Sequence, residues 1–458
     1  MTGIHASALT HADRSFPRLH PRPRSGWLND PNGILFANGR WHLFFQYNPD
    51  SARHERIHWG HMSSADLLRW EEHPIALAPQ PDGPDALGCW SGVGVIDDGV
   101  PALVYSAVRA DDGRSEVAVV RGAADATTWD EERTIAARRP EDDTVTMVRD
   151  PFVFTLGGHR WAIQGAARAD AGALLLYDAD DLGAWEERGV LLTADDDVAA
   201  RLPACDGWEC PQLVRVGDDW ALLVSLWREG LPHLGVGYIV GSLEIDASTG
   251  LPAFTGRSTG ILDGGSSFYA PQAVQSSGDG RVLLWGWAQE VAPEGVRQRT
   301  VEETDAHGWS GVLTFPRELT VHGDAVELTP ARELTALRTE AADAARLPDQ
   351  AEVRLTGAGS ASLRLSGSPG PSGGNGGSDG SGDSAAPSAS DATDQVVWSG
   401  ELRPGDEVRI LIDASLIEVH PSGRPSLTLR AYPGEGERYR VVHEPGVGVS
   451  AWRLAIPS

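Results

Sequence analysis

Five chemically distinctive residues recur along this chain at almost constant steps, and this spacing limits the folds that the sequence can adopt. Asp30, Trp90, Asp150, Glu209 and Tyr269 are separated by steps of 60, 60, 59 and 60 residues. A step of this size in a sequence rich in Gly, Trp and Asp indicates a structural repeat, in which each residue occupies the same place in its own unit. Three of the five are carboxylic acids, so the repeat would gather distant acids into one site.

A second series with a similar step supports the repeat. The pattern Asp-x-x-x-Trp occurs at 66–70, 125–129 and 181–185. Short apolar runs of strand length surround these markers, and none has the periodicity of a helix. Several short strands in a unit of about sixty residues are typical of a β-propeller blade. We therefore predict an all-β chain that begins with a five-bladed β-propeller at 17–330. A long β-sandwich with coincidental spacing is the alternative.

The chain changes character after the predicted propeller. Alternating, strand-like segments fill the region 341–458, which predicts a C-terminal β-sandwich domain. Residues 366–394 are almost entirely Gly, Ser, Pro, Ala and Asp, and they interrupt this domain. Such a segment cannot bury enough apolar surface to order itself, so we expect a flexible surface insert there.

Charge and cysteine content exclude several classes of partner. The formal net charge of −27 argues against nucleic acid or an anionic membrane. Cys89, Cys205 and Cys210 are too few for a disulfide framework. Residues 1–18 lack the apolar segment of a secretory signal, and no apolar run is long enough to span a membrane. We expect a cytoplasmic protein, and the sequence does not indicate its oligomeric state.

The most informative motif is the string WLNDPNG at 27–33. Its Asp-Pro and Asn-Gly pairs predict a turn directly before a strand, with Asp30 held at a fixed place. The segments 149–151 (RDP) and 209–211 (ECP) also place an acid just before a proline and a new strand. An isolated Asp-Pro pair is usually only a turn former, whereas three acids in phase indicate a shared site.

Three inward-facing acids could bind a divalent cation or cleave a glycosidic bond. No histidine partner or D-x-D-x-D-G cluster lies near them, and the spacing of His42, His58 and His61 matches no zinc motif, so we predict no metal site. Glycoside hydrolysis instead needs a nucleophile and an acid/base, and it requires no cofactor. The tryptophans beside the acids, which could offer flat surfaces to sugar rings, are Trp27, Trp59, Trp90 and Trp208.

The neighbours of two acids suggest different roles. Trp208 directly precedes Glu209, and an apolar neighbour favours the protonated form that a general acid needs. Asp30 lies among Asn29, Asn32 and the backbone N–H groups of its turn, which favour the ionised form. Asp30 is therefore the expected nucleophile.

Taken together, the motifs resemble glycoside hydrolase family 32, the family of invertases and fructanases. The strings that carry the resemblance are WLNDPNG at 27–33, FFQYNP at 44–49, WGH at 59–61, CWSG at 89–92, RDP at 149–151, WECP at 208–211, FYAPQ at 268–272 and GWSGVLTFPREL at 308–319. They follow one another across the whole predicted propeller. The string DASLIEV at 413–419 is similar to the D-x-S-x-x-E-x-F signature of the family's C-terminal β-sandwich.

The resemblance implies a role for each matching residue. Asp30 would be the nucleophile that forms a covalent fructosyl-enzyme, and Glu209 the general acid/base. Asp150, with Arg149, would bind furanose hydroxyls and stabilise the transition state. Such a site retains configuration, with the two reacting carboxyl groups about 5–5.5 Å apart. The further candidate substrate-binding residues are Asn29, Gln46, Trp59, Trp90, Ser91 and Tyr269.

Two positions depart from the family pattern. His420 stands where the sandwich signature usually has Phe, which affects only local packing. Ser267 stands where Asp is common, so sugar contacts at that position are expected to differ.

The sequence thus predicts a retaining, exo-acting β-fructofuranosidase. Its substrates would carry terminal non-reducing β-D-fructofuranosyl residues, with sucrose favoured and fructo-oligosaccharides as further candidates. A sucrose-6-phosphate hydrolase would need a cationic pocket, for which Arg53, Arg56 and Arg228 are candidates. An exo-inulinase, a levanase or a fructosyltransferase stays open. A non-catalytic fructan-binding propeller is disfavoured, because all three acids are present.

Overall fold

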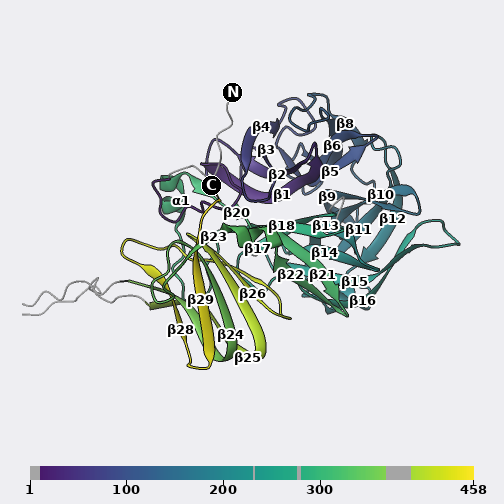
Figure 1. The fold of residues 1–458 in the computed structure, drawn as a ribbon. Coiled ribbons are helices and arrows are strands. Elements are labelled where there is room, and N and C mark those ends of the chain that lie inside the picture. Colours follow the sequence, from purple (N-terminus) through teal and green to yellow (C-terminus); the bar gives the residue numbers. More distant parts are fainter. Residues whose placement is uncertain (1–10, 231–232, 276–279, 368–393, 458) are drawn as a thin grey trace, which may run out of the picture.

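A computed structural model describes residues 11–230, 233–275, 280–367 and 394–457. Within them, a five-bladed β-propeller precedes a β-sandwich, as predicted, and the two domains lie side by side (Figure 1). The strands of each blade pair in sequence order, because short turns join neighbouring antiparallel strands.

The five blades follow one another along the sequence, and each blade corresponds to one step of the repeat. Blade 1 contains β1 (Gly26–Ala37), β2 (Arg40–Asn48), β3 (His58–Ser64) and β4 (Glu71–Leu77). Blade 2 contains β5 (Gly88–Asp97), β6 (Val100–Val108), β7 (Glu116–Arg121) and β8 (Thr134–Ala137). Blade 3 contains β9 (Val145–Leu156), β10 (His159–Arg168), β11 (Ala171–Asp178) and β12 (Glu186–Thr193). Blade 4 contains β13 (Gly207–Val216), β14 (Asp219–Trp227), β15 (Val236–Ile245) and β16 (Pro252–Ile261). Blade 5 contains β17 (Phe268–Gln275), β18 (Val282–Ala288), β21 (Arg317–His322) and β22 (Ala325–Pro330).

A short segment between β18 and β21 of blade 5 closes the ring. The strand β19 (Trp309–Ser310) pairs in parallel with β1, and β20 (Val312–Leu313) pairs with β18, so one stretch of chain joins the last blade to the first. The helix α1 (Val301–His307) leads into it and begins with a capping box formed by Thr300 and Glu303. Two 3₁₀ turns, Ala199–Arg201 and Arg332–Leu337, precede blade 4 and the sandwich.

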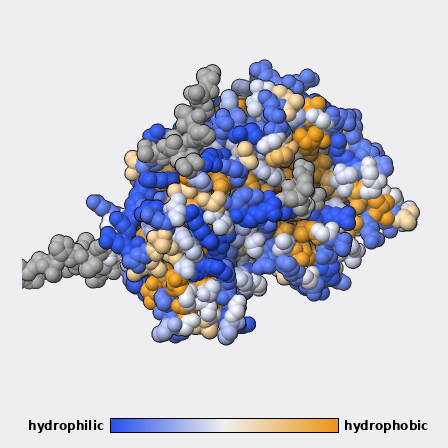
Figure 2. All heavy atoms as spheres, viewed as in Figure 1, coloured by the Kyte–Doolittle hydropathy of each residue, from blue (hydrophilic) through white to orange (hydrophobic). Residues whose placement is uncertain are grey.

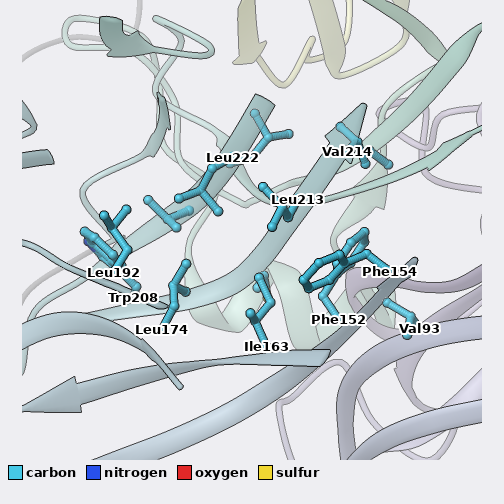
Figure 3. Close-up of a cluster of buried hydrophobic side chains, with 14 of the residues drawn as sticks. Val93, Phe152, Phe154, Ile163, Leu174, Leu192, Trp208, Leu213, Val214 and Leu222 are labelled. Atoms are coloured by element: carbon cyan, nitrogen blue, oxygen red, sulfur yellow. The ribbon is translucent and has the colours of Figure 1, made fainter. Parts of the chain in front are cut away.

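Apolar side chains pack the blades against one another. Between blades 3 and 4, Ile163, Leu174, Leu213 and Leu222 lie in one buried cluster (Figure 3). Each such side chain contributes about 1.5–3 kcal/mol when fully buried. Trp208 belongs to the same cluster, and its ring lies over Gly172, where an added Cβ would come within 2.5 Å of it. Trp208 is therefore a core residue, and the prediction that it offers a surface to sugars is wrong.

The sandwich is built around two long strands, β24 and β25. β24 pairs with β25 along one edge, and along the other with β29 and then β28. Most of the predicted insert, residues 368–393, lies outside the described residues, and at its ends Ser366 pairs with Asp394. The strands of the sandwich are β23 (Arg338–Ala341), β24 (Gln350–Ser366), β25 (Asp394–Asp413), β26 (Leu416–Pro421), β27 (Leu427–Arg430), β28 (Arg438–His443) and β29 (Val447–Leu454).

The surface of the molecule is mostly hydrophilic on the face shown in Figure 2. On the face that Figure 2 shows, hydrophilic residues cover most of the surface and hydrophobic residues form separate patches. Within the described residues, no helix is long and apolar enough to cross a membrane.

The sandwich signature holds the two domains together through buried charges. His20, in the segment before blade 1, places Nδ1 2.8 Å from Asp413 and Nε2 3.0 Å from Glu418. Arg317 of blade 5 is fully buried, and its guanidinium lies 2.7 Å from Glu418 and 2.7 Å from Asp263. The two acids of the signature therefore bind cations from outside the sandwich.

The charge state of His20 follows from these partners. Burial alone would lower the pKa of His20, but the hydrogen bonds to Asp413 and Glu418 outweigh it and raise the pKa above the ordinary value. Both ring nitrogens face carboxylates, so the imidazolium form satisfies every partner. A raised pKa of His20 stabilises the folded protein. This stabilisation is complete at pH values below the ordinary histidine pKa, and it is lost as the pH rises through the folded-state pKa.

We predict that His20→Gln lowers the free energy of unfolding by about 3–5 kcal/mol at pH 6, because it leaves the buried carboxylate of Asp413 without its cation. The difference from the unmodified protein should be smaller at pH 9 than at pH 6, because the stability that a raised pKa adds is lost as the pH rises through it. Denaturant unfolding at both pH values measures this, and the exposed His159→Gln serves as control. An equal loss at the two pH values would contradict the ionic role of His20.

Candidate active site

Each blade has a β-bulge in its first strand, at or directly beside candidate site residues. In β1, Leu28 pairs with Tyr47 and Pro31 with Phe45, so Asn29 and Asp30 together face one residue of β2. A bulge re-aims side chains and often occurs beside active sites. The corresponding bulge residues are Trp90–Ser91 in β5, Asp150–Pro151 in β9, Cys210–Pro211 in β13 and Ala270–Pro271 in β17.

The WLNDPNG string is not a turn, which corrects one prediction. It lies wholly inside β1, which pairs with β2 on one side and with β19 on the other. Pairing on both sides keeps the strand extended, so the turn-forming residues produce two irregularities within it. The second is centred near Gly33, whose φ of 56° suits glycine.

Each of the five recurring residues lies in the first strand of its blade, but the five do not occupy the same position relative to the bulge. Arg149, Glu209 and Tyr269 are each the last paired residue before the bulge of their strand. Asp30 is instead the second residue of its bulge, and Trp90 and Asp150 are the first residues of theirs. The prediction that all five occupy the same place is therefore wrong in detail.

The three equivalent residues form a hydrogen-bonded row across blades 3, 4 and 5. Arg149 donates from Nε and lies 3.0 Å from Glu209 Oε1, and its Nη2 lies 2.9 Å from the same oxygen. Tyr269 donates its hydroxyl proton to Glu209 Oε2 at 2.6 Å. Burial and the charge of Glu209 keep the pKa of Tyr269 well above its ordinary value, so its hydroxyl stays a donor. Both oxygens of Glu209 are thus fixed in orientation.

Asp30 accepts hydrogen bonds from neighbours in two blades. Asn29 Nδ2 lies 3.1 Å from Oδ1, while Gln46 Nε2 at 3.2 Å and Ser91 Oγ at 2.5 Å lie beside Oδ2. Burial, opposed by the Ser91 hydrogen bond and assisted by the charge of Glu209, raises the pKa of Asp30 to about 6. Asn32, expected to help ionise Asp30, accepts a hydrogen bond from Gly92 instead.

Asp150 lies close enough to the other two acids to be influenced by the charges of both. Its backbone N–H donates to Ser106, and its Oδ2 accepts from the backbone N–H of Cys210 at 2.9 Å. Burial and the charges of Glu209 and Asp30 raise the pKa of Asp150. The Cys210 thiol lies 3.6 Å from Asp30 and 3.4 Å from Asp150, and burial holds its pKa well above the ordinary value. Cys210 therefore remains a thiol and is no nucleophile.

The three acids open into a pocket of about 890 Å³. One wall is a chain of aromatic rings in which consecutive centroids are 3.9–5.9 Å apart. In order along this wall, the rings are those of Trp90, His54, Trp27, Trp287, His233 and Tyr269. The lining also contains the carboxylates of Asp111, Asp112, Asp170, Asp206 and Glu229.

Most of the predicted site residues line this pocket, but two do not. Trp59 is fully buried, and its Nε1 donates to the backbone carbonyl of Trp90 at 3.1 Å, so it supports Trp90 from behind. Ser91 is also buried and acts through its hydrogen bond to Asp30. The predicted residues that do line the pocket are Asn29, Asp30, Gln46, Trp90, Arg149, Asp150, Glu209 and Tyr269.

Four aromatic lining residues were missed in the sequence. Trp227 and Trp287 lie sixty residues apart, at the ends of β14 and β18, so the repeat itself could have revealed them. His54 and His233 lie in loops, where no periodic signal marks them. Nothing in the described residues forms a group of three or more His, Cys, Asp or Glu side chains suited to a metal ion.

Comparison with known proteins identifies the family. Residues 20–330 match the family model described as the glycosyl hydrolases family 32 N-terminal domain. The chain belongs to glycoside hydrolase family 32. The chain is therefore a glycoside hydrolase, and the predicted resemblance is confirmed.

Individual members of family 32 differ in the substrates that their names give. A sucrose-6-phosphate hydrolase of Klebsiella pneumoniae is 37% identical over 339 residues, which cover 72% of this chain and 70% of that protein. A raffinose invertase of Escherichia coli is 33% identical and covers 70% and 66%. The structure of a β-fructofuranosidase of Bombyx mori is 26% identical, with a TM-score of 0.73 over 97% of this chain and 95% of that chain.

The raised pKa of Asp30 predicts how activity of this family 32 enzyme depends on pH. Asp30 is the predicted nucleophile, and a nucleophilic carboxylate must be ionised, so we expect kcat/KM to fall as pH drops below about 6, tenfold per pH unit. Initial rates between pH 4 and 8 measure this limb. Ser91→Ala removes a hydrogen bond that favours the ionised form, so the limb should move to higher pH in that variant. A limb near pH 4 in the unmodified protein would contradict the effect of burial.

Proposed function

We propose that the chain is a retaining, exo-acting β-fructofuranosidase that hydrolyses sucrose. The observation that carries this proposal is the placement of Asp30, Asp150 and Glu209 together on the lining of one pocket, each held by named donors. Asp30 and Asp150 are buried in the pocket lining and Glu209 is half-buried, which favours attack on a terminal sugar unit. The aromatic wall offers flat apolar surface to sugar rings.

The mechanism follows from the surroundings of each acid. The carboxylate of Asp30 attacks the anomeric carbon of the fructosyl unit while Glu209 gives its proton to the glycosidic oxygen, and the leaving sugar departs. Water then attacks the fructosyl ester, Glu209 takes the water proton, and fructose leaves with its configuration retained. Arg149 and Tyr269 stabilise the Glu209 carboxylate between these steps. Asp150 binds the furanose hydroxyls and stabilises positive charge in the transition state.

The charges of the pocket favour an unphosphorylated substrate. Among the pocket-lining residues that the structure describes, Arg149 is the one arginine, and it is bound to Glu209. Burial lowers the pKa of His54, so its ring is neutral. A phosphate group would instead meet the acidic residues of the lining, of which Asp112 pairs with Arg139 and Asp206 lies 3.7 Å from Arg228. The other acidic lining residues are Asp111, Asp170 and Glu229. Such a lining repels anions.

The three arginines considered as phosphate ligands are not part of the pocket lining, although Arg228 lies 3.7 Å from the lining residue Asp206. Arg53 pairs with Asp305 at 2.5 Å, and Arg228 donates to the carbonyl of Ala204. Neither they nor Arg56 line the pocket. These positions support sucrose over sucrose 6-phosphate, although relatives of both kinds match the chain.

Initial rates on sucrose, sucrose 6-phosphate, 1-kestose, inulin and levan test the proposal, with fructose and glucose detected separately. We expect kcat/KM for sucrose to exceed that for sucrose 6-phosphate by at least about tenfold, since an uncompensated phosphate charge costs more than about 1.4 kcal/mol. Glucose in excess of fructose would reveal fructosyl transfer. A preference for the phosphorylated sugar would refute the charge argument, and no release from any substrate would refute the activity.

A further inference from the structure

The loop between β14 and β15 places a histidine against the tyrosine that binds Glu209. The ring of His233 stacks on the ring of Tyr269, with centroids 3.9 Å apart and an interplanar angle of 18°. The hydroxyl of Tyr269 in turn donates to Glu209 Oε2 at 2.6 Å. His233 is thus one side chain removed from the candidate acid/base.

His233 is itself held from two further directions. Its Nδ1 lies 2.6 Å from Oε1 of Gln289, the residue that follows β18. The ring of Trp287 meets it edge-on, with centroids 5.8 Å apart at 68°. A side chain with a hydrogen bond, a stacked ring and an edge contact has little rotational freedom. The contacts therefore form a continuous path from Gln289 through His233 and Tyr269 to Glu209.

We propose that His233 is a positioning residue for the general acid/base, a role that rests on the proposed function of Glu209. The stacked imidazole fixes the rotation of the Tyr269 ring and with it the direction of the hydroxyl hydrogen bond. Misplacement of an interacting group by about 1 Å can cost a hundredfold in rate. Arg149 holds the other oxygen of Glu209, so loss of the Tyr269 bond weakens the arrangement without abolishing it.

This role predicts a defect that depends on the leaving group. When Glu209 protonates the glycosidic oxygen of sucrose, it becomes a carboxylate, and the Tyr269 hydrogen bond stabilises that product of proton transfer. Fluoride departs as an anion and needs no proton from Glu209. A residue that acts through the acid should therefore matter for sucrose and not for β-D-fructofuranosyl fluoride.

The first experiment compares kcat/KM of His233→Ala on these two substrates. We expect a fall of about tenfold on sucrose, a part of the 10²–10⁴ that acid–base catalysis contributes, and less than about twofold on the fluoride. His233→Phe keeps a flat ring over Tyr269 and should restore most of the activity on sucrose. His159→Ala, which removes an exposed histidine paired with Asp180, is the matched control and should change neither rate.

Equal losses of kcat/KM on the two substrates would overturn the proposal. They would show that His233 shapes the pocket or binds the leaving sugar, and that it does not act through Glu209. Unchanged rates on both would overturn it as well. Unmodified protein that cleaves neither substrate would refute the proposed function. In that case, crystal structures of the unmodified protein and of His233→Ala test whether His233 positions Tyr269. A Tyr269 hydroxyl that stays within about 2.6–2.8 Å of Glu209 Oε2 in His233→Ala would overturn it, and a displaced hydroxyl would support it.

Discussion

Asp30→Ala is expected to lower turnover of sucrose at least about a thousandfold, because it removes the carboxylate that we propose forms the fructosyl ester, a role that Asp150 does not take over. Asp150 is bound to the backbone of Cys210 and lies in a different blade. Asp30→Asn should be equally inactive, since an amide keeps the shape of the carboxyl but is a very weak nucleophile. Initial rates on sucrose, together with thermal unfolding, measure both effects.

The thermal stability of Asp30→Asn should be preserved or increased, although its activity is lost. The folded-state pKa of Asp30 is raised to about 6, so ionisation at neutral pH is disfavoured in the folded protein relative to the unfolded chain. Replacing the buried carboxylate by a neutral amide removes this cost, and Asp30→Asn should therefore unfold at the same or a higher temperature at pH 7. At pH 3, where both states are protonated, the advantage should vanish.

The matched control is Asp130→Asn, an exposed aspartate that is not part of the pocket lining. It should leave both rate and unfolding temperature unchanged. Substantial sucrose turnover by folded Asp30→Asn would remove Asp30 from the mechanism. Loss of folding in that variant would instead contradict the pKa argument.

The sixty-residue spacing was sufficient to predict the blades, because a propeller places one inner strand per blade around a common axis. Strands at equivalent places must bury similar faces, so the spacing alone assigns Asp30, Asp150 and Glu209 to one site. The register within those strands could not be predicted. A bulge changes which residue faces the pocket, and its position depends on pairing with β2, β10 and β14.

Side-chain direction explains the remaining errors. Trp208 directly precedes Glu209 and Trp59 belongs to the family-like string at 59–61, yet both lie in blade cores, where tryptophan buries the largest apolar area. His233, in contrast, was not predicted from the sequence but lines the pocket. It lies in a loop without a motif, and only the packing of that loop on Tyr269 gives it a role. Sequence patterns therefore located the strands of the site, while tertiary packing selected which loop residues complete it.

Glu209→Gln should also lower kcat/KM on sucrose at least about a thousandfold, because an amide cannot give a proton to the glycosidic oxygen. The variant keeps the size of the side chain, and its amide oxygen can still accept from Arg149. Folding should therefore be preserved, and thermal unfolding checks this. Glu244→Gln, which changes an exposed acid on β15, is the control and should retain full activity.

The same variant separates the two chemical steps. Fluoride leaves without a proton, so Glu209→Gln should still transfer the fructosyl unit of β-D-fructofuranosyl fluoride to Asp30. Hydrolysis of that ester needs a base to take a proton from water, and the variant has lost it. A fructosyl-enzyme should accumulate, and mass spectrometry of the intact protein would detect one added fructosyl unit on Asp30. Rapid turnover of the fluoride without any adduct would show that another group activates water, and Asp150 would then be the first residue to replace.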